Sequence, residues 1–579
     1  MKKTLLPLAI ILSMVSLAGC NQNNNGGGGE GGGSYTAQDP LDLGPDFKFE
    51  YYPKKEQNKV ASIIEGASGK MKIDVALNFE GTADAWQVLA DEYERLCGGA
   101  VDVNIIKNLD TAGYTERLRI EENNAKTDWD IVQGNLMYSA GEHCQNLRQT
   151  INTQNPYAGN KIWADFLQNR AYETEVSSSS DTTYLLNTEN LSTAWFVNTA
   201  ATTKAGITNP NPETWEDLID MLDRLQQAGY KYPLGLSLTK DGIAASQFSW
   251  LLRIYGDYYY RQKYALTSKT YDSVTKTDDK FEYDKSAKNI EAFSASYNKF
   301  SYSYSRAVCL MLDESTEYYC GPNSDLYKDF LSQFQKIAKY IKPSAYQLSF
   351  NEVREAFIAQ KNGNNGDEAP QIMLDYSGSG LAFLSADALK NNIDFFDYPM
   401  METTYVEHGT ALRRVGGNGG YLAILNYHNR RQTNLNKDFL QFVLSPYGQT
   451  IYYKALREKN ISPKGLTTVL NDLVVIPEEW VSFFQSNKIK DIEDTGLADN
   501  NKFINVGAVS FFANSKVSLK SVDLWQRLLT TNDLSVDQFA SEWYYSLLSN
   551  WPTVVSEHKG WKEDAYLYSH FVDPSYIAD

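Results

Sequence analysis

The sequence predicts an α/β protein whose sheets are rich in parallel strands and are divided between two or more lobes. Between residues 70 and 133, strand-like and helix-like segments alternate, which is typical of a parallel sheet covered by helices. The chain has 579 residues, more than one hydrophobic core usually covers. Its 42% hydrophobic and 22% charged residues are the ordinary balance of a globular protein.

The first lobe is predicted to contain three strands and two helices. The strands are expected at residues 72–79, 101–105 and 129–132, where apolar residues run together or alternate. The first helix begins after Thr82, a candidate N-cap, and ends at Gly98, and a polar helix follows at about 113–124. Ligands of such sheets bind beyond the carboxyl ends of the strands. Here these ends are residues 78–81, 108–114 and 133–135.

A second unit begins near Trp195. Thr214 and Asp217 form a possible capping box for a helix that ends at Gly229. Residues 255–320 are rich in Tyr, Lys, Ser and Asp with little apolar periodicity, so we expect a surface insertion there. The later elements are a helix at 326–341 stopped by Pro343, a strand at 371–374 leading into a turn at 375–378, a strand at 421–425, a helix at about 436–456 and a mostly helical remainder.

The N-terminus has the features of an export sequence. Met1-Lys2-Lys3 is basic, residues 5–17 are apolar, and small residues precede Cys20, so residues 1–19 are predicted to be a signal peptide. Residues 17–20 resemble the lipobox of bacterial lipoproteins, in which the cysteine is lipidated and becomes the new N-terminus. Acyl chains on Cys20 would hold the protein to a membrane, with residues 20–45 as a Gly-rich tether. The alternative is an ordinary signal peptide with a chance cysteine.

Charge, cysteine usage and the missing motifs exclude several classes of protein. A net charge of −18 argues against nucleic acid, whose phosphates require a basic face. Beyond Cys20, the cysteines Cys97, Cys144, Cys309 and Cys320 are interpreted as structural, either free or paired as 309–320 and 97–144. No metal-ligand spacing, nucleotide-binding fingerprint or hydrolase motif occurs, so neither a cofactor nor a metal is expected.

Several further segments stand in a characteristic order between residues 70 and 465. They are Ala85–Glu94, Asp128–Val132, Ala194–Asn198 with Ala205–Ile207 and Pro212–Leu218, Val353–Phe357 with Gln371–Met373, and Gly416–Ile424 with Asp438–Phe442 and Ser445–Gln449. In this order the chain resembles the lipid-anchored extracellular solute-binding proteins of bacterial ABC importers, family 1, which includes the maltose-type sugar binders. The run from Ala194 to Leu218 is the most specific part of the resemblance.

The resemblance implies a two-lobe, periplasmic-binding-protein-like fold with parallel-rich central sheets and a hinge. Residues 46–192 with about 400–455 would form lobe 1, and 193–399 with about 456–579 lobe 2, including the insertion at 255–320 and a helical C-terminal extension. It also implies a monomer on the outer face of the cell membrane that captures a carbohydrate, an oligosaccharide, by hinge closure. The ligand would then pass to the transmembrane permease subunits of the importer.

Sugars require polar partners for their hydroxyls and aromatic rings for their apolar faces. The expected ligand contacts of the first lobe are Asn78, Glu80, Tyr114, Gln133 and Asn135. Those of the hinge and the second lobe are Trp195, Trp250, Asp375, Tyr376, Gly417 and Asn418. The two tryptophans can equally be core residues, and the glycine can serve only to shape a turn.

Two other functions compete with transport. A glycoside hydrolase needs only two suitably spaced carboxylates, and Asp375 after an apolar strand is a candidate for one of them. The chain lacks the eight repeated strand–helix units of a barrel hydrolase, and a strand-end Asp commonly forms a turn. A surface glycan adhesin is the second alternative. We therefore expect a binding protein that is not an enzyme.

Overall fold

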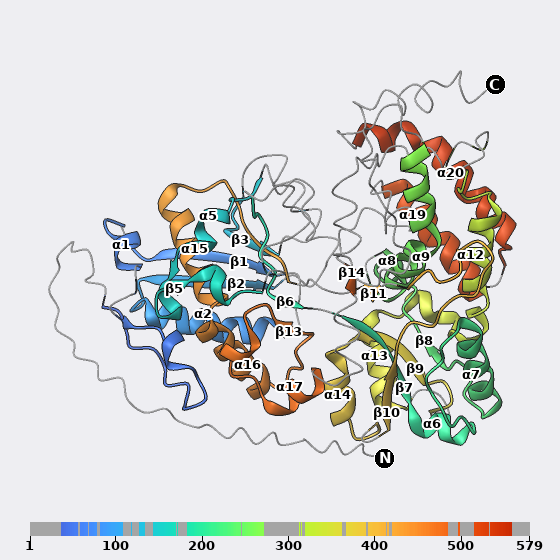
Figure 1. The fold of residues 1–579 in the computed structure, drawn as a ribbon, viewed down its shortest axis with the longest axis horizontal. Helices are drawn as coiled ribbons and strands as arrows, with labels where there is room; N and C mark the ends of the chain where they lie inside the picture. Colours follow the sequence, from blue (N-terminus) through green and yellow to red (C-terminus); the bar gives the residue numbers. More distant parts are fainter. Residues whose placement is uncertain are drawn as a thin grey trace, which may run out of the picture.

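The computed structural model describes residues 36–55, 58, 60–67, 69–77, 82–107, 117, 127–133, 143–168, 171, 182–190, 192–244, 246–270, 312, 314, 319–361, 366–389, 392–412, 414–415, 420–484, 496–497, 515–531 and 533–557. These residues form two lobes, each with its own sheet and helices, joined through short strands that lie between them (Figure 1). In this part of the chain, none of the helices combines the length and the apolar character needed to cross a bilayer.

The sheet of the first lobe has the order β12-β3-β1-β2. Its strands are β1 (Met71–Leu77), β2 (Val101–Lys107), β3 (Ile131–Gln133) and β12 (Leu422–Ile424). Strand β1 is parallel to both β2 and β3, as the sequence predicts, whereas β12 joins antiparallel to β3. The carboxyl ends of the three parallel strands therefore meet at one edge.

Three helices cover this sheet, and their ends follow local chemistry. Helix α2 (Ala83–Leu96) occupies the predicted place, and its buried side chains recur every three or four residues. The helix expected at about 436–456 is two helices, α15 (Arg430–Val443) and α16 (Pro446–Glu458). The break lies at Ser445, whose hydroxyl accepts a hydrogen bond from the Gly448 amide and so caps the second helix.

The second lobe has a mixed sheet of order β10-β7-β9-β8. Its strands are β7 (Thr193–Asn198), β8 (Leu234–Gly235), β9 (Ile372–Tyr376) and β10 (Ile393–Phe396). Strand β9 runs parallel to β8 and antiparallel to β7. It extends two residues beyond its predicted end, so Asp375 and Tyr376 are strand residues and the turn begins after them.

Helices with well-defined starts surround this second sheet. Helix α7 (Trp215–Gln227) has the predicted capping box of Thr214 and Asp217, with both reciprocal hydrogen bonds present. Ser349 and Glu352 form the same motif at the start of α13 (Phe350–Ala359). The helix expected at 326–341 is shorter: α12 (Asp325–Gln335) ends six residues early, and a separate 3-10 turn (Ala338–Tyr340) follows it before Pro343.

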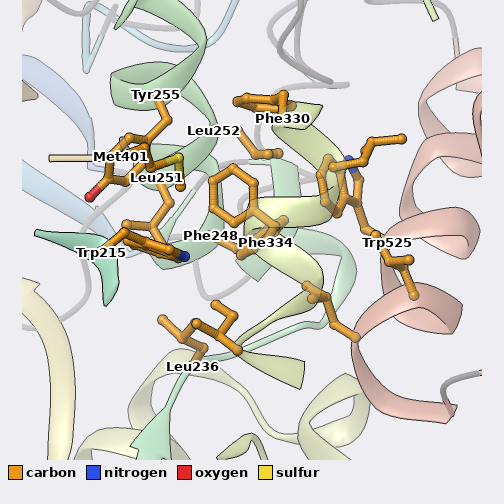
Figure 2. Close-up of a cluster of buried hydrophobic side chains, with 14 of the residues drawn as sticks. Trp215, Leu236, Phe248, Leu251, Leu252, Tyr255, Phe330, Phe334, Met401 and Trp525 are labelled. Atoms are coloured by element: carbon orange, nitrogen blue, oxygen red, sulfur yellow. The ribbon is translucent and has the colours of Figure 1, made fainter. Parts of the chain in front are cut away.

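The expected insertion at 255–320 does not begin at Tyr255. Helix α9 (Gln247–Thr270) continues through this position, and Tyr255, Tyr259 and Tyr260 are buried in the second core. Tyr255 packs edge-on against Trp215 (Figure 2). Aromatic rings spaced along a buried helix explain the Tyr-rich composition of this stretch. Most of the expected insertion, residues 271–311, lies outside the described residues.

The C-terminal part packs into the same core. Its elements are α19 (Ser515–Gln526), a π-helical turn (Arg527–Thr531) and α20 (Val536–Glu557). Trp525 is fully buried and contacts Phe248 and Phe334 (Figure 2). It also contacts Phe539 on α20. The prediction of a mostly helical C-terminal part that joins the second lobe agrees with this packing for the described residues.

The shorter elements complete the two lobes and the connections. The short helices are α1 (Val60–Ile64), α5 (Arg148–Ile151), α6 (Thr199–Lys204), α8 (Lys240–Ala244), α14 (Ser379–Ser385) and α17 (Glu478–Phe484). The short strands are β4 (Gln154–Asn155), β5 (Lys161–Ile162), β6 (Glu189–Asn190), β11 (Arg414–Val415), β13 (Leu466–Thr467) and β14 (Gly496–Leu497). The 3-10 turns are Phe49–Tyr51, Pro156–Ala158, Trp163–Phe166, Ala338–Tyr340, Pro343–Gln347 and Asn471–Leu473.

Strands β6 and β13 pair antiparallel where the chain passes between the lobes. The chain after β13 stays with the first lobe at first, since Leu466, Trp480 and Phe484 belong to its core. The expected boundary at about residue 456 is therefore too early, because α17 buries its apolar side chains in lobe 1. In the other direction, Met401 and Val406 belong to the core of lobe 2, beyond its expected end at 399.

The start of the first lobe and its cysteines also differ from expectation. The expected tether of residues 20–45 overlaps a segment fixed to lobe 1, in which the Leu41 amide donates to the hydroxyl of Tyr447 over 2.7 Å. Cys97 is a free buried thiol, so the Cys97–Cys144 disulfide is not formed. Burial raises the pKa of the Cys97 thiol well above its usual value. Cys20 and Cys309 lie outside the described residues.

Candidate functional site

Polar and aromatic side chains gather where strand β9 ends beside the connections between the lobes. Tyr376, the last residue of β9, lies opposite Thr193, the first residue of β7. The turn after β9 is fixed to two connecting segments: the Ser377 amide donates to the Ser192 carbonyl, and the Gly378 amide donates to the Lys464 carbonyl. The carboxyl end of β9 is thus held next to the hinge.

A buried ion pair forms the base of this site. Arg354 on α13 donates through Nε and Nη2 to the two carboxylate oxygens of Asp375, each over 2.7 Å. The Asp375 side chain is fully buried, and its Oδ1 also accepts from Ser379 Oγ (2.9 Å) and from the Tyr376 amide (2.6 Å). Both carboxylate oxygens are therefore occupied by partners within the protein.

Three aromatic rings lie above the ion pair. Trp250 and Tyr376 have ring centroids 4.9 Å apart, and Phe350 packs edge-on against Trp250 at 5.7 Å. The Arg354 guanidinium lies 4.5 Å from the Phe350 ring centre, a cation–π distance. Trp250 is only 4% exposed, whereas Phe350 and Tyr376 are half-buried. We name Trp250, Phe350 and Tyr376 the aromatic face; its accessible rings are those of Phe350 and Tyr376.

A second pair of charged residues lies at the hinge. Lys464, just before β13, places its Nζ 5.3 Å from the Tyr376 ring centre, and Glu189 stands on the paired strand β6. Desolvation lowers the pKa of Lys464 to about 8, although the Glu189 carboxylate acts in the opposite direction. Desolvation likewise raises the pKa of Glu189 against the effect of Lys464. Glu189, beside the first lobe, thus acts on the charge of Lys464, and Lys464 in turn lies against the ring of Tyr376 in the aromatic face.

The first lobe contributes a polar wall. Gln133, at the carboxyl end of β3, is 3% exposed and lines a small cavity with Thr82, Glu189 and Tyr452. The cavity holds about 10 Å³, near the lower limit for one water molecule. Glu189 therefore borders both the first-lobe wall and the region of Lys464.

The remaining candidate contacts are either buried in the core of the second lobe or lie outside the described residues. Trp195 is fully buried, and its ring stacks on Phe396 with centroids 6.1 Å apart. It belongs to the core of the second lobe, as its alternative interpretation as a core residue predicts. Its indole N–H has no hydrogen-bond partner among the described residues. Outside the described residues lie Asn78, Glu80, Tyr114, Asn135, Gly417 and Asn418.

Four residues of the site do not appear among the sequence candidates: Glu189, Phe350, Arg354 and Lys464. Phe350 and Arg354 could have been found, because the capping motif Ser349–Glu352 starts a helix on which residues four apart share a face. Glu189 and Lys464 carry no local pattern, since they meet through the pairing of strands far apart in sequence.

The arrangement favours binding over covalent chemistry. The site offers accessible rings with guanidinium and ammonium donors beside them, and polar oxygens line the small cavity of the first lobe. Asp375 is the carboxylate considered for hydrolysis, and both of its oxygens accept hydrogen bonds from Arg354 within the protein, so neither is directed at a ligand. Among the described residues, no group of three or more His, Cys, Asp or Glu side chains is placed to hold a metal ion.

Two α/β lobes with a polar and aromatic site at their connections define a class, the two-lobe solute-binding proteins. A sequence model of the family described as bacterial extracellular solute-binding protein matches residues 79–450, so the chain belongs to this family. The family consists of binding proteins and not of enzymes, in agreement with the expectation from the sequence. It also places the protein outside the cytoplasm. No curated protein matches the chain in sequence.

Solved structures share the fold at low sequence identity. The chain is similar to an ABC transporter solute-binding protein of Agrobacterium radiobacter K84 in complex with ribitol, with TM-score 0.54, 11% identity, and coverage of 82% of this chain and 98% of that chain. Maltose-bound MalE3 of T. maritima gives TM-score 0.52 and 12% identity, covering 82% and 99%. A chitin oligosaccharide binding protein gives 0.50 and 15%, covering 82% and 98%.

The ion pair makes a first prediction. Asp375→Ala should lower the free energy of unfolding by about 3–5 kcal/mol, because it leaves the Arg354 cation partly buried and uncompensated. The double variant Asp375→Ala with Arg354→Met should lose less than the single variant, since no charge is then stranded. Urea unfolding of the single and double variants measures both effects. The exposed pair Lys107–Asp84 supplies the control, and Asp84→Ala should leave stability nearly unchanged. A double variant that is no more stable than Asp375→Ala would contradict the argument.

The lowered pKa of Lys464 makes a second prediction. Between pH 8 and 10.5 the folded protein has released this proton while the unfolded chain still binds it, so stability through this group rises with pH across that window. The unfolding free energy of wild type minus that of Lys464→Met should therefore increase from pH 8 to 10.5 and stay constant below pH 7. Lys454→Met on the exposed side of α16 is the control. A constant or falling difference across the window would show that Lys464 is not desolvated.

Proposed function

We propose that the protein captures a carbohydrate, an oligosaccharide, between its two lobes and delivers it to the transmembrane permease subunits of an ABC importer. The main support is the aromatic face at the carboxyl end of β9, beside the connections between the lobes, in a chain of the solute-binding family. This position lets one bound molecule contact residues from both lobes and from the hinge.

The chemistry of the site suits a sugar. The accessible rings of Phe350 and Tyr376 supply area for stacking on the apolar face of a pyranose. Sugar hydroxyls both donate and accept, so they match the Arg354 and Lys464 donors beside these rings and the Glu189 carboxylate on the neighbouring strand β6. Among the similar proteins, one binds ribitol, one binds maltose and one binds chitin oligosaccharide.

In this proposal, ligand-binding energy drives closure of the lobes. Contacts to both walls exist only in a closed state, so the ligand shifts the population toward it. Trp250, Asp375 and Tyr376 act on the second lobe: Tyr376 stacks on the ligand, Trp250 supports that ring, and Asp375 orients Arg354. Trp195 supports the sheet beneath them. Gln133 acts on the first lobe, together with the proposed contacts Asn78, Glu80, Tyr114, Asn135, Gly417 and Asn418.

The lipid anchor completes the proposal. The protein works as a monomer, and lipidated Cys20 retains it at the outer face of the membrane near the permease. Residues 36–52 support this arrangement, because Arg95 Nη2 donates to the Asp39 carbonyl over 2.8 Å and so fixes the segment after the Gly-rich stretch to lobe 1. The tether would therefore pull on the first lobe and leave the second lobe able to move.

Carbohydrate binding is the third prediction. At least one of maltotriose, mannotriose, xylotriose and chitotriose should raise the melting temperature, because a ligand stabilises the state that binds it. Tyr376→Ala should weaken binding of that ligand by about 1–3 kcal/mol, or roughly five- to 150-fold, through lost stacking. Calorimetry measures the affinity, and small-angle scattering measures the compaction.

The matched control is Tyr545→Ala, an exposed tyrosine on α20 of the same lobe that is distant in sequence from every residue of the site. It should leave the affinity unchanged. Prolonged incubation should return the sugar intact, whereas enzymatic release of cleaved sugar would favour the hydrolase alternative. If no carbohydrate changes the melting temperature, the proposed ligand class is wrong.

Lipidation is the fourth prediction. The wild-type protein should incorporate labelled fatty acid and sediment with membranes, and Cys20→Ala should lose both properties, because the thiol is the only attachment point proposed. Cys97→Ala, at a buried thiol, should retain both. A Cys20→Ala protein that stays labelled and membrane-bound would overturn the anchor.

A further inference from the structure

The C-terminal helices lie outside the family match but pack behind the proposed binding face. The match ends at residue 450, whereas α19 and α20 lie after residue 514. Their side chains Trp525, Leu528 and Phe539 are fully buried in the core of the second lobe. This part of the chain is therefore integral to that lobe.

Two contacts connect α19 to the segment that carries Trp250. The Trp525 ring packs edge-on against Phe248 on α9, with centroids 5.1 Å apart (Figure 2). The neighbouring residue Gln526 donates from Nε2 to the Leu238 carbonyl over 2.8 Å, just before α8 and α9. Trp525 itself is held by shape, because its indole N–H has no partner among the described residues.

Helix α9 transmits this support to the aromatic face. Phe248 and Trp250 are two residues apart, which places them about 200° apart around a helix, on opposite sides. Trp525 thus presses on one side of α9, and Tyr376 and Phe350 contact Trp250 on the other. The first residue, Gln247, fixes the helix to the sheet by accepting from the Ser237 amide (2.7 Å) and donating to the Leu374 carbonyl (2.6 Å).

We infer that Trp525 is a positioning residue for ligand binding, which holds Trp250 against Tyr376 and Phe350 through Phe248 and helix α9. The inference rests on the proposed function for the role of the aromatic face. Its physical basis is that half-buried rings keep one orientation only when packed from behind, and stacking contacts lose affinity with small displacements. The C-terminal helices then contribute to the site without touching the ligand.

The test uses full-length protein labelled with 5-fluorotryptophan and observed by fluorine NMR. The Trp250 resonance is identified as the one that Trp250→Phe removes. Trp525→Leu should shift or broaden that resonance, because Phe248 loses its support, and Trp525→Phe should restore it. Trp163→Leu is the matched control: Trp163 is a fully buried tryptophan of the first lobe, so its loss should destabilise the protein without moving the Trp250 resonance.

Binding provides the second measurement, with the trisaccharide that gives the largest thermal shift. Trp525→Leu should lower the affinity for this trisaccharide at least about fivefold at a temperature far below unfolding, which is in the usual range for coupled sites. Trp163→Leu should leave the affinity unchanged. If Trp525→Leu does not fold, Gln526→Ala removes only the Leu238 bond and should shift the same resonance to a smaller extent. An unchanged Trp250 resonance in the folded variants overturns the inference. Failure of every sugar to bind overturns the proposed function instead, and the NMR result still decides the placement of Trp250.

Discussion

The Arg354–Asp375 ion pair is the interaction on which the geometry of the site depends. A fully buried carboxylate is tolerated only when its oxygens are satisfied, and Arg354, Ser379 and the chain itself satisfy them. The bidentate pairing fixes α13 to the end of β9, and it thereby sets the distance between Phe350 and Tyr376. A buried charge thus specifies the position of two uncharged rings.

A second constraint is that two of the segments connecting the lobes are hydrogen-bonded to each other. Strands β6 and β13 pair with each other, so the first crossing and a later one form a single unit. Glu189 and Lys464 stand on this unit and bring a negative group from the first-lobe wall toward a positive group over Tyr376. In the proposed closure, movement of the lobes would change the surroundings of both groups and would couple the electrostatics of the hinge to ligand binding.

The sequence predicts those helices and strands whose positions depend on neighbouring residues alone. Apolar periodicity located β1, α2 and β2, and the capping residues Thr214 and Asp217 located α7. The Tyr-rich stretch after residue 255 misled the prediction, because tyrosine is counted as polar although its ring packs well along α9. Asp375 and Tyr376 could be placed at a strand end from the sequence, and they lie there, whereas the position of Lys464 could not be predicted, since its neighbours are distant in sequence.

The lobe boundaries could not be predicted either, because they depend on packing between residues that are distant in sequence. Helix α17 belongs to the first core through Trp480 and Phe484, yet the residue between these anchors, Phe483, packs on Phe395 of the second lobe. Its ring fills the place of a side chain at Gly380, where an added Cβ would lie 2.6 Å from it. Such a contact requires a glycine on one lobe and an aromatic ring on the other. Hydrophobic periodicity within a single segment cannot predict it. Because α17 is anchored in one lobe and packs against the other, the proposed rotation of the lobes would have to change this contact as well as the paired strands.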